Sequence, residues 1–350
     1  MPGMPSEILP SPAPLDRRLS IAPMMDWTDR HCRFFHRLLA PRALLYTEMV
    51  TTGAILHNDP ERFLAFDPRE SPVALQLGGS EPEELARATA IAEAWAYAEI
   101  NLNCGCPSDR VQSGRFGACL MAEPARVAEC IAAMRGATAK PVTVKCRIGI
   151  DDSDEEGFLD RFVDRVAAAG CRVFIVHARK AWLKGLSPKQ NREVPPLNHP
   201  RVARLKQRRP DLEIVLNGGI TEPEAAAAAL ELVDGVMIGR AAYQTPYRLP
   251  AFTRALQDPG FADPDRACVL AAMRAHAAEV ARHGTPVRAI ARHLLGLYNG
   301  ERGARAWRRR LSETMHEDDA GPGLLIPLAA PLRDEPAPPR ADGSPALTIS

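Results

Sequence analysis

The sequence predicts an α/β chain: a TIM (β/α)8 barrel followed by an all-helical domain. Three observations support this. Short apolar runs alternate with longer Ala-rich helical patterns over about 240 residues, the usual size of such a barrel. Polar or charged residues stand at the ends of the runs, where a barrel carries its active site. After about residue 260 the alternation stops and the pattern is helical throughout.

Eight runs rich in apolar and β-branched residues are expected to be strands, because polar or glycine residues bound each of them. In chain order they are 19–24, 43–48, 73–79, 99–105, 142–149, 172–179, 213–219 and 234–240. A doubly wound sheet is the alternative arrangement of strands and helices. Its GxGxxG fingerprint after the first strand is missing, so the barrel is preferred.

Helices are expected after several of these strands. Segments beginning at Ser80, Ser153 and Thr221 each offer an N-cap residue with carboxylates in the following turn. Carboxylates there suit the positive end of the helix dipole. The sequence therefore predicts N-caps at these three residues.

Composition sets the domain boundaries and excludes several classes of protein. The expected division is a disordered 1–16, a barrel at 17–258, a helical domain at 259–318 and a Pro-rich disordered 319–350. No apolar run reaches the roughly 18 residues of a membrane helix, and no signal peptide is evident, so a cytoplasmic protein is expected. The 8 cysteines form no CxxC pair and no pattern with paired histidines, so no metal site is expected. Nothing in the chain suggests a stable protein partner, and a monomer is the default.

The loops after the seventh and eighth runs carry Gly218, Gly219, Gly239 and Arg240. Glycines let backbone N–H groups approach an anion, and these two loops form the usual phosphate site of a TIM barrel. The plainer interpretation is that the glycines only make tight turns. Finding both loops in the right order favours a phosphate.

Three polar residues at other strand ends are candidates for ligand binding. Lys145 at the mouth of an apolar barrel should face an anion, such as the pyrimidine side of a reduced flavin, or a nearby acid such as Asp151 or Asp152. His177 alone is more often a structural histidine. Gln76 would hydrogen-bond either a flavin edge or a neighbouring loop.

The stretch NLNCGCPSDRV places Cys104 and Cys106 at the end of the fourth run. Pro107 forces a turn there, and Gly105 permits close approach of the backbone to a ligand. A thiol in that position would serve as general acid or nucleophile, and two packing cysteines are the plain alternative. In an extended chain the two thiols share a face, so spacing does not choose between them.

Two segments are strongly basic in a chain whose net charge is +1. Ten Lys and Arg residues lie within 179–209 against one acid, Glu193, and eight Arg lie within 282–310 against Glu301. A charge run is usually a solvated face, but two of them suggest a polyanionic substrate. Trp182 and Trp307 lie within these runs and would either stack on bases or pack internally.

At this point the sequence resembles a known family. The stretches EINLNCGCPSDRVQSGRFGACLM, PVTVKCRIGIDD and HARKAWLKGLSPKQNREVPPL, among others between about residues 19 and 310, are similar to the tRNA-dihydrouridine synthases. The similarity is nearest to the bacterial A-type enzymes, which act on D-loop positions 20 and 20a of tRNA. The resemblance implies an FMN-bound barrel with a C-terminal tRNA-binding domain, in which NADPH reduces the flavin, and the flavin passes hydride to C6 of a uracil.

The resemblance also assigns residues. It makes Cys106, in the GCPS motif, the acid that protonates C5, and leaves Cys104 at a variable position. The implied FMN contacts are Pro23, Met24, Met25, Gln76, Lys145, His177, Asn217, Gly218, Gly219, Gly239 and Arg240. Asn103 would meet the target uridine, and Lys189 and Arg192 would lie near the RNA. From the basic run of the helical domain we add Arg288, Arg292, Arg302 and Arg305 as tRNA contacts.

Two other functions remain as alternatives. A flavin enzyme acting on a free pyrimidine would turn over without tRNA, and would leave the helical domain and the basic runs unexplained. An RNA chaperone with a silent barrel would keep its effect after Cys106→Ala, and would leave the flavin-binding set unexplained.

Overall fold

The computed structural model describes residues 15–154, 156–317 and 320–326. Its centre is a closed barrel in which each strand pairs in parallel with the next and β8 pairs with β1. This confirms the predicted fold class. The strands are β1 (Leu19–Ile21), β2 (Leu44–Thr51), β3 (Val73–Gly78), β4 (Glu99–Cys104), β5 (Val142–Arg147), β6 (Val173–His177), β7 (Glu213–Asn217) and β8 (Gly235–Ile238).

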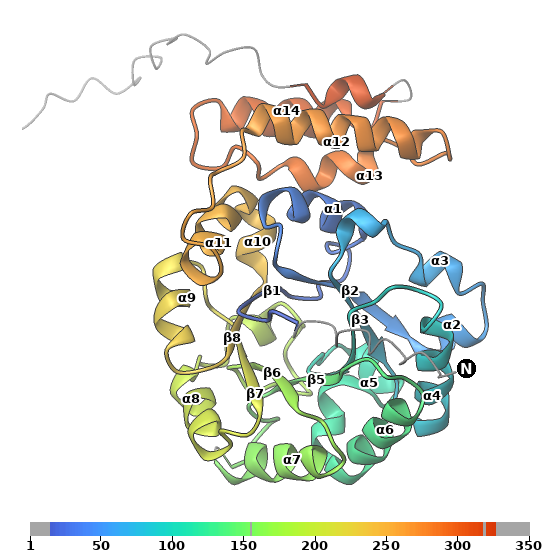
Figure 1. The fold of residues 1–350 in the computed structure, drawn as a ribbon, viewed down its shortest axis with the longest axis vertical. Helices are drawn as coiled ribbons and strands as arrows, with labels where there is room; N and C mark the ends of the chain where they lie inside the picture. The colour runs from blue at the N-terminus through green and yellow to red at the C-terminus, as the bar shows by residue number, and fades with distance from the viewer. Residues whose placement is uncertain (1–14, 155, 318–319, 327–350) are drawn as a thin grey trace, which may run out of the picture.

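Helices surround the barrel and a further group of helices stacks beside α1, at the top of Figure 1. The first set is α1 (Arg30–Leu39), α2 (Thr52–Leu56), α3 (Glu61–Leu64), α4 (Pro82–Ala92), α5 (Asp109–Ser113), α6 (Pro124–Gly136), α7 (Gly157–Ala168), α8 (His199–Arg208), α9 (Pro223–Leu230), α10 (Arg240–Gln244) and α11 (Leu249–Leu256). The further group is α12 (Arg266–Ala281), α13 (Arg288–Ala291) and α14 (Ala304–Thr314). No helix among the described residues is long and apolar enough to cross a membrane.

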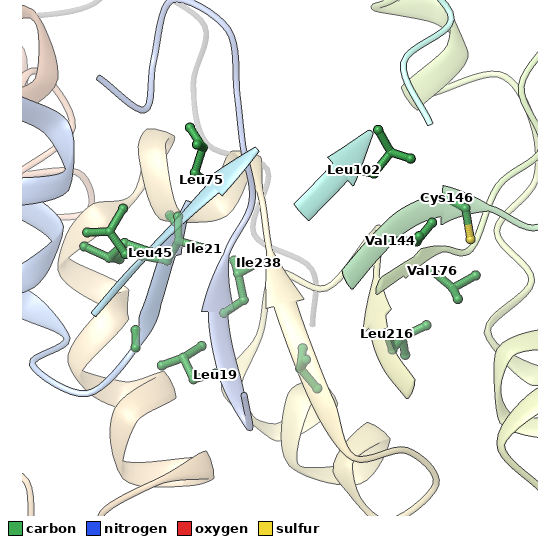
Figure 2. Packing of buried hydrophobic residues seen from close by; sticks show 14 of the residues in the cluster. Leu19, Ile21, Leu45, Leu75, Leu102, Val144, Cys146, Val176, Leu216 and Ile238 are labelled. Atoms are coloured by element: carbon green, nitrogen blue, oxygen red, sulfur yellow. The ribbon is translucent and has the colours of Figure 1, made fainter. Parts of the chain in front are cut away.

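Successive residues of each strand point to opposite faces, so the barrel has two cores. One lies between the strands and the surrounding helices and includes Leu45, Leu102 and Val176 (Figure 2). The other fills the barrel interior and includes Tyr46 and Ile175. Strands buried on both faces explain why the sequence shows continuous apolar runs rather than strict alternation.

The predicted N-caps are wrong. Helices α4 and α9 are capped one residue later than expected, at Glu81 and Glu222, and α7 is capped at Glu156. In α4 and α9 a proline follows the cap, and a proline at the first helical position is favourable because its fixed φ matches the helix and it has no N–H to satisfy. The proline therefore decides where these two helices begin.

We call helices α12 to α14, with the turns between them, the helical unit. It docks onto α1 through polar and aromatic contacts. His31 Nδ1 lies 2.9 Å from His276 Nε2, and the His276 ring stacks on Phe34 with ring centres 4.3 Å apart. Arg292 donates to Asp29, the N-cap of α1, at 2.5 Å. These contacts hold the helices against the loop that follows β1.

The predicted disordered tails fall largely outside the described residues. Part of the C-terminal one, 320–326, is described, and there the prediction is wrong. It contains a 3-10 turn at Pro322–Leu324, and Leu325 is only 1% exposed within the hydrophobic core.

Candidate active site

A cavity of about 1060 Å³ opens at the carboxyl ends of the strands. The side chains that end different strands meet there because parallel strands of a barrel all point to one rim. All eleven residues predicted to contact a cofactor line this cavity: Pro23, Met24, Met25, Gln76, Lys145, His177, Asn217, Gly218, Gly219, Gly239 and Arg240. Cys106, Asn103 and Arg192 line it as well.

The two cysteines of the GCP stretch lie in different environments. Strand β4 ends at Cys104, whose side chain is fully buried in the core beneath the helices. Burial raises the pKa of the Cys104 thiol well above its ordinary value. After the turn at Gly105, Cys106 is half-buried, lines the cavity, and has its Sγ 3.5 Å from Ser108 Oγ. Only Cys106 can meet a molecule in the cavity.

Asn103 holds the backbone of this turn. Its Oδ1 accepts hydrogen bonds from the N–H groups of Gly105 and Cys106, both at 3.0 Å. Its Nδ2 donates to Gln76 Oε1 at 2.8 Å. The oxygen and the nitrogen of each amide are thus both bound to the protein, and the second N–H of Asn103 Nδ2 is left for a molecule in the cavity that Asn103 lines.

Lys145 projects from β5 into the cavity and donates to Asn217 Oδ1 at 3.0 Å. No carboxylate among the described residues pairs with it, so the suggested salt bridge to Asp151 or Asp152 is absent. Burial, together with repulsion from Arg147, lowers the pKa of Lys145 to about 8. A half-buried ammonium without a counter-ion is suited to an anionic ligand.

His177 ends β6 beside the glycine loop that follows β7. Burial and the neighbouring cations Arg147 and Lys145 lower the pKa of His177 well below its ordinary value, so the ring is neutral at pH 7. Gly218 has φ of 107°, and a Cβ there would lie 2.4 Å from His177 Cδ2. Only glycine fits this position, for reasons of both conformation and space.

Arg240 follows Gly239 after β8 and is paired with an acid. Its Nη1 donates to Glu193 Oε1 at 2.8 Å, so it links the rim of the barrel to the predicted RNA-facing loop. Arg192, in that loop, is exposed and lines the cavity, whereas Lys189 is exposed but lies outside the cavity lining.

The basic residues predicted in the helical unit lie outside the cavity lining. Arg288, Arg302 and Arg305 are exposed, and Arg292 pairs with Asp29, which itself lines the cavity. Trp307 is fully buried and donates to Leu294 O, so it packs internally. Trp182 is 37% exposed.

Sequence reasoning missed two residues that tie the Cys106 loop to the loop after β6. The guanidinium of Arg147, only 3% exposed, donates to the backbone oxygens of Gly105, Lys180 and Asn191 at 2.9 to 3.0 Å. Gln112 Nε2 donates to Pro107 O and Leu183 O at 2.8 and 2.7 Å. Arg147 had a signal in the sequence: it lies two residues after Lys145 in the same strand, and therefore on the same inward face.

The chain is similar to proteins of one known family. Residues 20–330 match the family model described as dihydrouridine synthase (Dus). A tRNA-dihydrouridine(20/20a) synthase of Xanthomonas axonopodis pv. citri is 58% identical over 305 residues, which are 87% of this chain and 90% of the relative. Proteins of the same name from Xanthomonas campestris pv. campestris and Escherichia coli O6:H1 are 57% and 54% identical, over 94% and 88% of this chain and 98% and 93% of the relatives. The chain therefore belongs to the dihydrouridine synthase family.

Proposed function

We propose that this protein reduces uridine to 5,6-dihydrouridine in the D-loop of tRNA, at positions 20 and 20a, using FMN that NADPH reduces. The observation that carries the proposal is that Cys106 and all eleven residues expected to contact the flavin line the same cavity. Family membership and the shared name of the three relatives support the same substrate. With tRNA as substrate, the activity would be cytoplasmic.

The residues present suit FMN. The cavity volume of about 1060 Å³ lies at the upper end of the range for ligand sites, which leaves room for a flavin and an extruded base. Lys145 would stabilise negative charge on the pyrimidine side of the ring, with Gln76 and Asn217 offering amide hydrogen bonds. Backbone N–H groups at Gly218, Gly219 and Gly239, with Arg240, would hold the phosphate. When bound, FMN supplies the hydride that C6 of uracil receives.

Cys106 would supply the proton for C5. The thiol must be protonated to act as an acid, and the half-buried side chain is held by Asn103 through the backbone of its turn. Asn103 retains an amide hydrogen that would orient the uracil. Cys104 has no access to the cavity and should play no part in the reaction.

The tRNA would bind across the rim of the barrel and the helical unit. A uracil stacked in folded tRNA cannot reach the cavity, so the nucleotide must be extruded into it. We assign contacts with the tRNA sugar-phosphate backbone to Lys189 and Arg192 beside the cavity, and to Arg288, Arg302 and Arg305 on the helices. Arg292 pairs with Asp29 where the helical unit meets the barrel. Binding through phosphates should weaken steeply with salt.

The decisive measurement is position-resolved dihydrouridine in unmodified tRNA after incubation with the purified flavoprotein and NADPH. Wild-type protein should form product at position 20, 20a or both. Cys106→Ala should lose about 10²-fold or more in rate, as expected when a general acid is removed. Cys104→Ala is the matched control, because it also removes a thiol, but one that is buried between the barrel and the helices and does not line the cavity. This variant should keep the activity.

The flavin absorbance of Cys106→Ala checks that the fold and cofactor site survive the substitution. Full activity of Cys106→Ala would refute its role as the acid. Wild-type protein that oxidises NADPH and leaves tRNA unchanged would refute the assigned substrate, and would favour a small-molecule flavin reductase.

A further inference from the structure

A continuous chain of hydrogen bonds runs through the barrel interior and ends at the backbone of Cys106. We call it the axial relay, and it consists of Glu99, Thr143, Asn101, Gln76 and Asn103. Each of these side chains is 8% exposed or less. They come from β3, β4 and β5. We propose that the axial relay is a positioning device, in which Glu99 and Thr143, through the two amides between them and Asn103, hold Asn103 at its Nδ2 while the N–H groups of the turn hold its Oδ1, and thereby fix the place of the Cys106 thiol.

The lower end of the relay has a fixed polarity. Glu99 Oε2 accepts from Arg17 at 2.7 Å, while Oε1 accepts from Tyr46 OH and Thr143 Oγ1, both at 2.6 Å. Burial and the neighbouring Glu99 raise the pKa of Tyr46 well above its ordinary value, so Tyr46 remains a donor. The Thr143 proton is directed to Glu99, so Thr143 Oγ1 can only accept from Asn101.

That constraint passes from one amide to the next. Asn101 Nδ2 donates to Thr143 Oγ1 at 2.9 Å, which turns Asn101 Oδ1 toward Gln76 Nε2 at 2.8 Å. Gln76 must then present Oε1 to Asn103 Nδ2, also at 2.8 Å. An amide can be turned over in place, so its partners decide its orientation, and here each amide decides the next.

The upper end imposes the same polarity independently. The N–H groups of Gly105 and Cys106 can only donate, and both donate to Asn103 Oδ1. Three amides thus stand between an acceptor-only carboxylate and two donor-only N–H groups, and one set of orientations satisfies them all. The strand register supports this arrangement, because Asn101 lies directly opposite Gln76 on β3 and Thr143 on β5.

The proposal goes beyond a structural role because two hydroxyls reach the same carboxylate oxygen and only one continues to Cys106. Thr143 and Tyr46 both donate to Glu99 Oε1, but among the described residues only Thr143 also accepts from the relay. Thr143→Val and Tyr46→Phe are therefore matched variants. Each removes one hydroxyl at the same depth and with little change of volume, and Thr143→Ser restores the hydroxyl.

The primary test is alkylation of Cys106 by iodoacetamide, followed by peptide mass spectrometry, with the exposed Cys268 of the same molecule as internal reference. This readout does not depend on turnover. We expect the Cys106/Cys268 rate ratio to rise about threefold or more in Thr143→Val, because both buried hydrogen bonds of the Thr143 hydroxyl are lost and the relay no longer holds the turn. Tyr46→Phe and Thr143→Ser should keep the wild-type ratio.

The second readout rests on the proposed function: reoxidation of the reduced flavin by tRNA, measured apart from its reduction by NADPH. Thr143→Val should slow the tRNA step by about tenfold, as a slightly misplaced acid does, and leave the NADPH step unchanged. Equal changes in Thr143→Val and Tyr46→Phe, or no change in either, would overturn the positioning role. If wild-type protein forms no dihydrouridine, the proposed function fails, and the alkylation ratios still decide the relay.

Discussion

The two halves of the barrel interior differ in chemistry although both belong to the same sheet. Inward side chains of β6 to β8 are apolar below the rim, except for Glu213 at the start of β7, which pairs with Arg17: they are Val173, Ile175, Val215 and Met237. Inward side chains of β3 to β5 are mostly polar and equally buried: Gln76, Glu99, Asn101, Asn103 and Thr143. The apolar half needs only to fill space. The polar half must satisfy every hydrogen-bond donor and acceptor, so it has one preferred arrangement of side chains and tolerates fewer substitutions.

The difference has a functional reason. The apolar half lies under the glycine loops and His177, where backbone and a neutral ring suffice. The polar half lies under Lys145 and the Cys106 turn, where the proposed function requires a charge and a proton donor to be held in place. A network of directed hydrogen bonds can fix an orientation, which apolar packing alone does less sharply.

Placing a polar residue in the apolar half should have the largest effect. Ile175→Asn leaves a buried amide without partners and removes apolar volume, and should lower the free energy of unfolding by roughly 3–5 kcal/mol. Urea denaturation measures the loss. Ile175→Val is the control and should lose only about 0.5–1.5 kcal/mol. An Ile175→Asn protein close to wild type in stability would mean that this half accepts polar groups.

The reverse exchange in the polar half should be somewhat less destabilising. Asn101→Leu keeps the volume but leaves Gln76 Nε2 without its acceptor and Thr143 Oγ1 without its donor, a loss of roughly 2–4 kcal/mol. The same urea titration detects it. Unchanged or increased stability would show that the polar half is ordinary core with replaceable hydrogen bonds.

The charge at the rim predicts a smaller, pH-dependent effect. Burial lowers the pKa of Lys145 from its ordinary 10.5 to about 8. Between those values the unfolded chain binds one more proton than the folded chain, so the contribution of Lys145 to stability rises with pH from about 8 to 10.5. Urea midpoints of cofactor-free protein should show this rise in wild type relative to Lys145→Met. Other groups titrate in both proteins and cancel, so parallel profiles would refute the lowered pKa.

Much of the fold and of the candidate site is predictable from the sequence, for identifiable reasons. The eight strands are recognisable in the sequence as apolar runs. Because the carboxyl ends of all strands of such a barrel lie on one face, Gln76, Lys145, His177 and Asn217 are expected at one rim, where they line the cavity. The choice between Cys104 and Cys106 could not come from spacing, because it depends on the backbone turn at Gly105 that ends the strand.

Other features required information that a single sequence does not contain. The axial relay depends on register, which sets Asn101 opposite Gln76 and Thr143, and parallel strands far apart in the chain carry no local mark of register. The charges around Arg292 led to its prediction as a nucleic-acid contact, and they carried no sign that it also pairs with Asp29, far away in the sequence. Charge patterns identify a face and do not identify the partner of each side chain.

The three carbonyls held by Arg147 limit how this enzyme can be redesigned. One buried guanidinium joins the turn that carries Cys106 to the loop that carries Lys189 and Arg192. The two loops are therefore structurally coupled through Arg147, although some forty residues of chain separate Gly105 from Arg147. A chimera that transplants either loop alone would leave the buried Arg147 guanidinium without some of its acceptors, so the proposed RNA preference should be altered by exchanging both loops together with position 147.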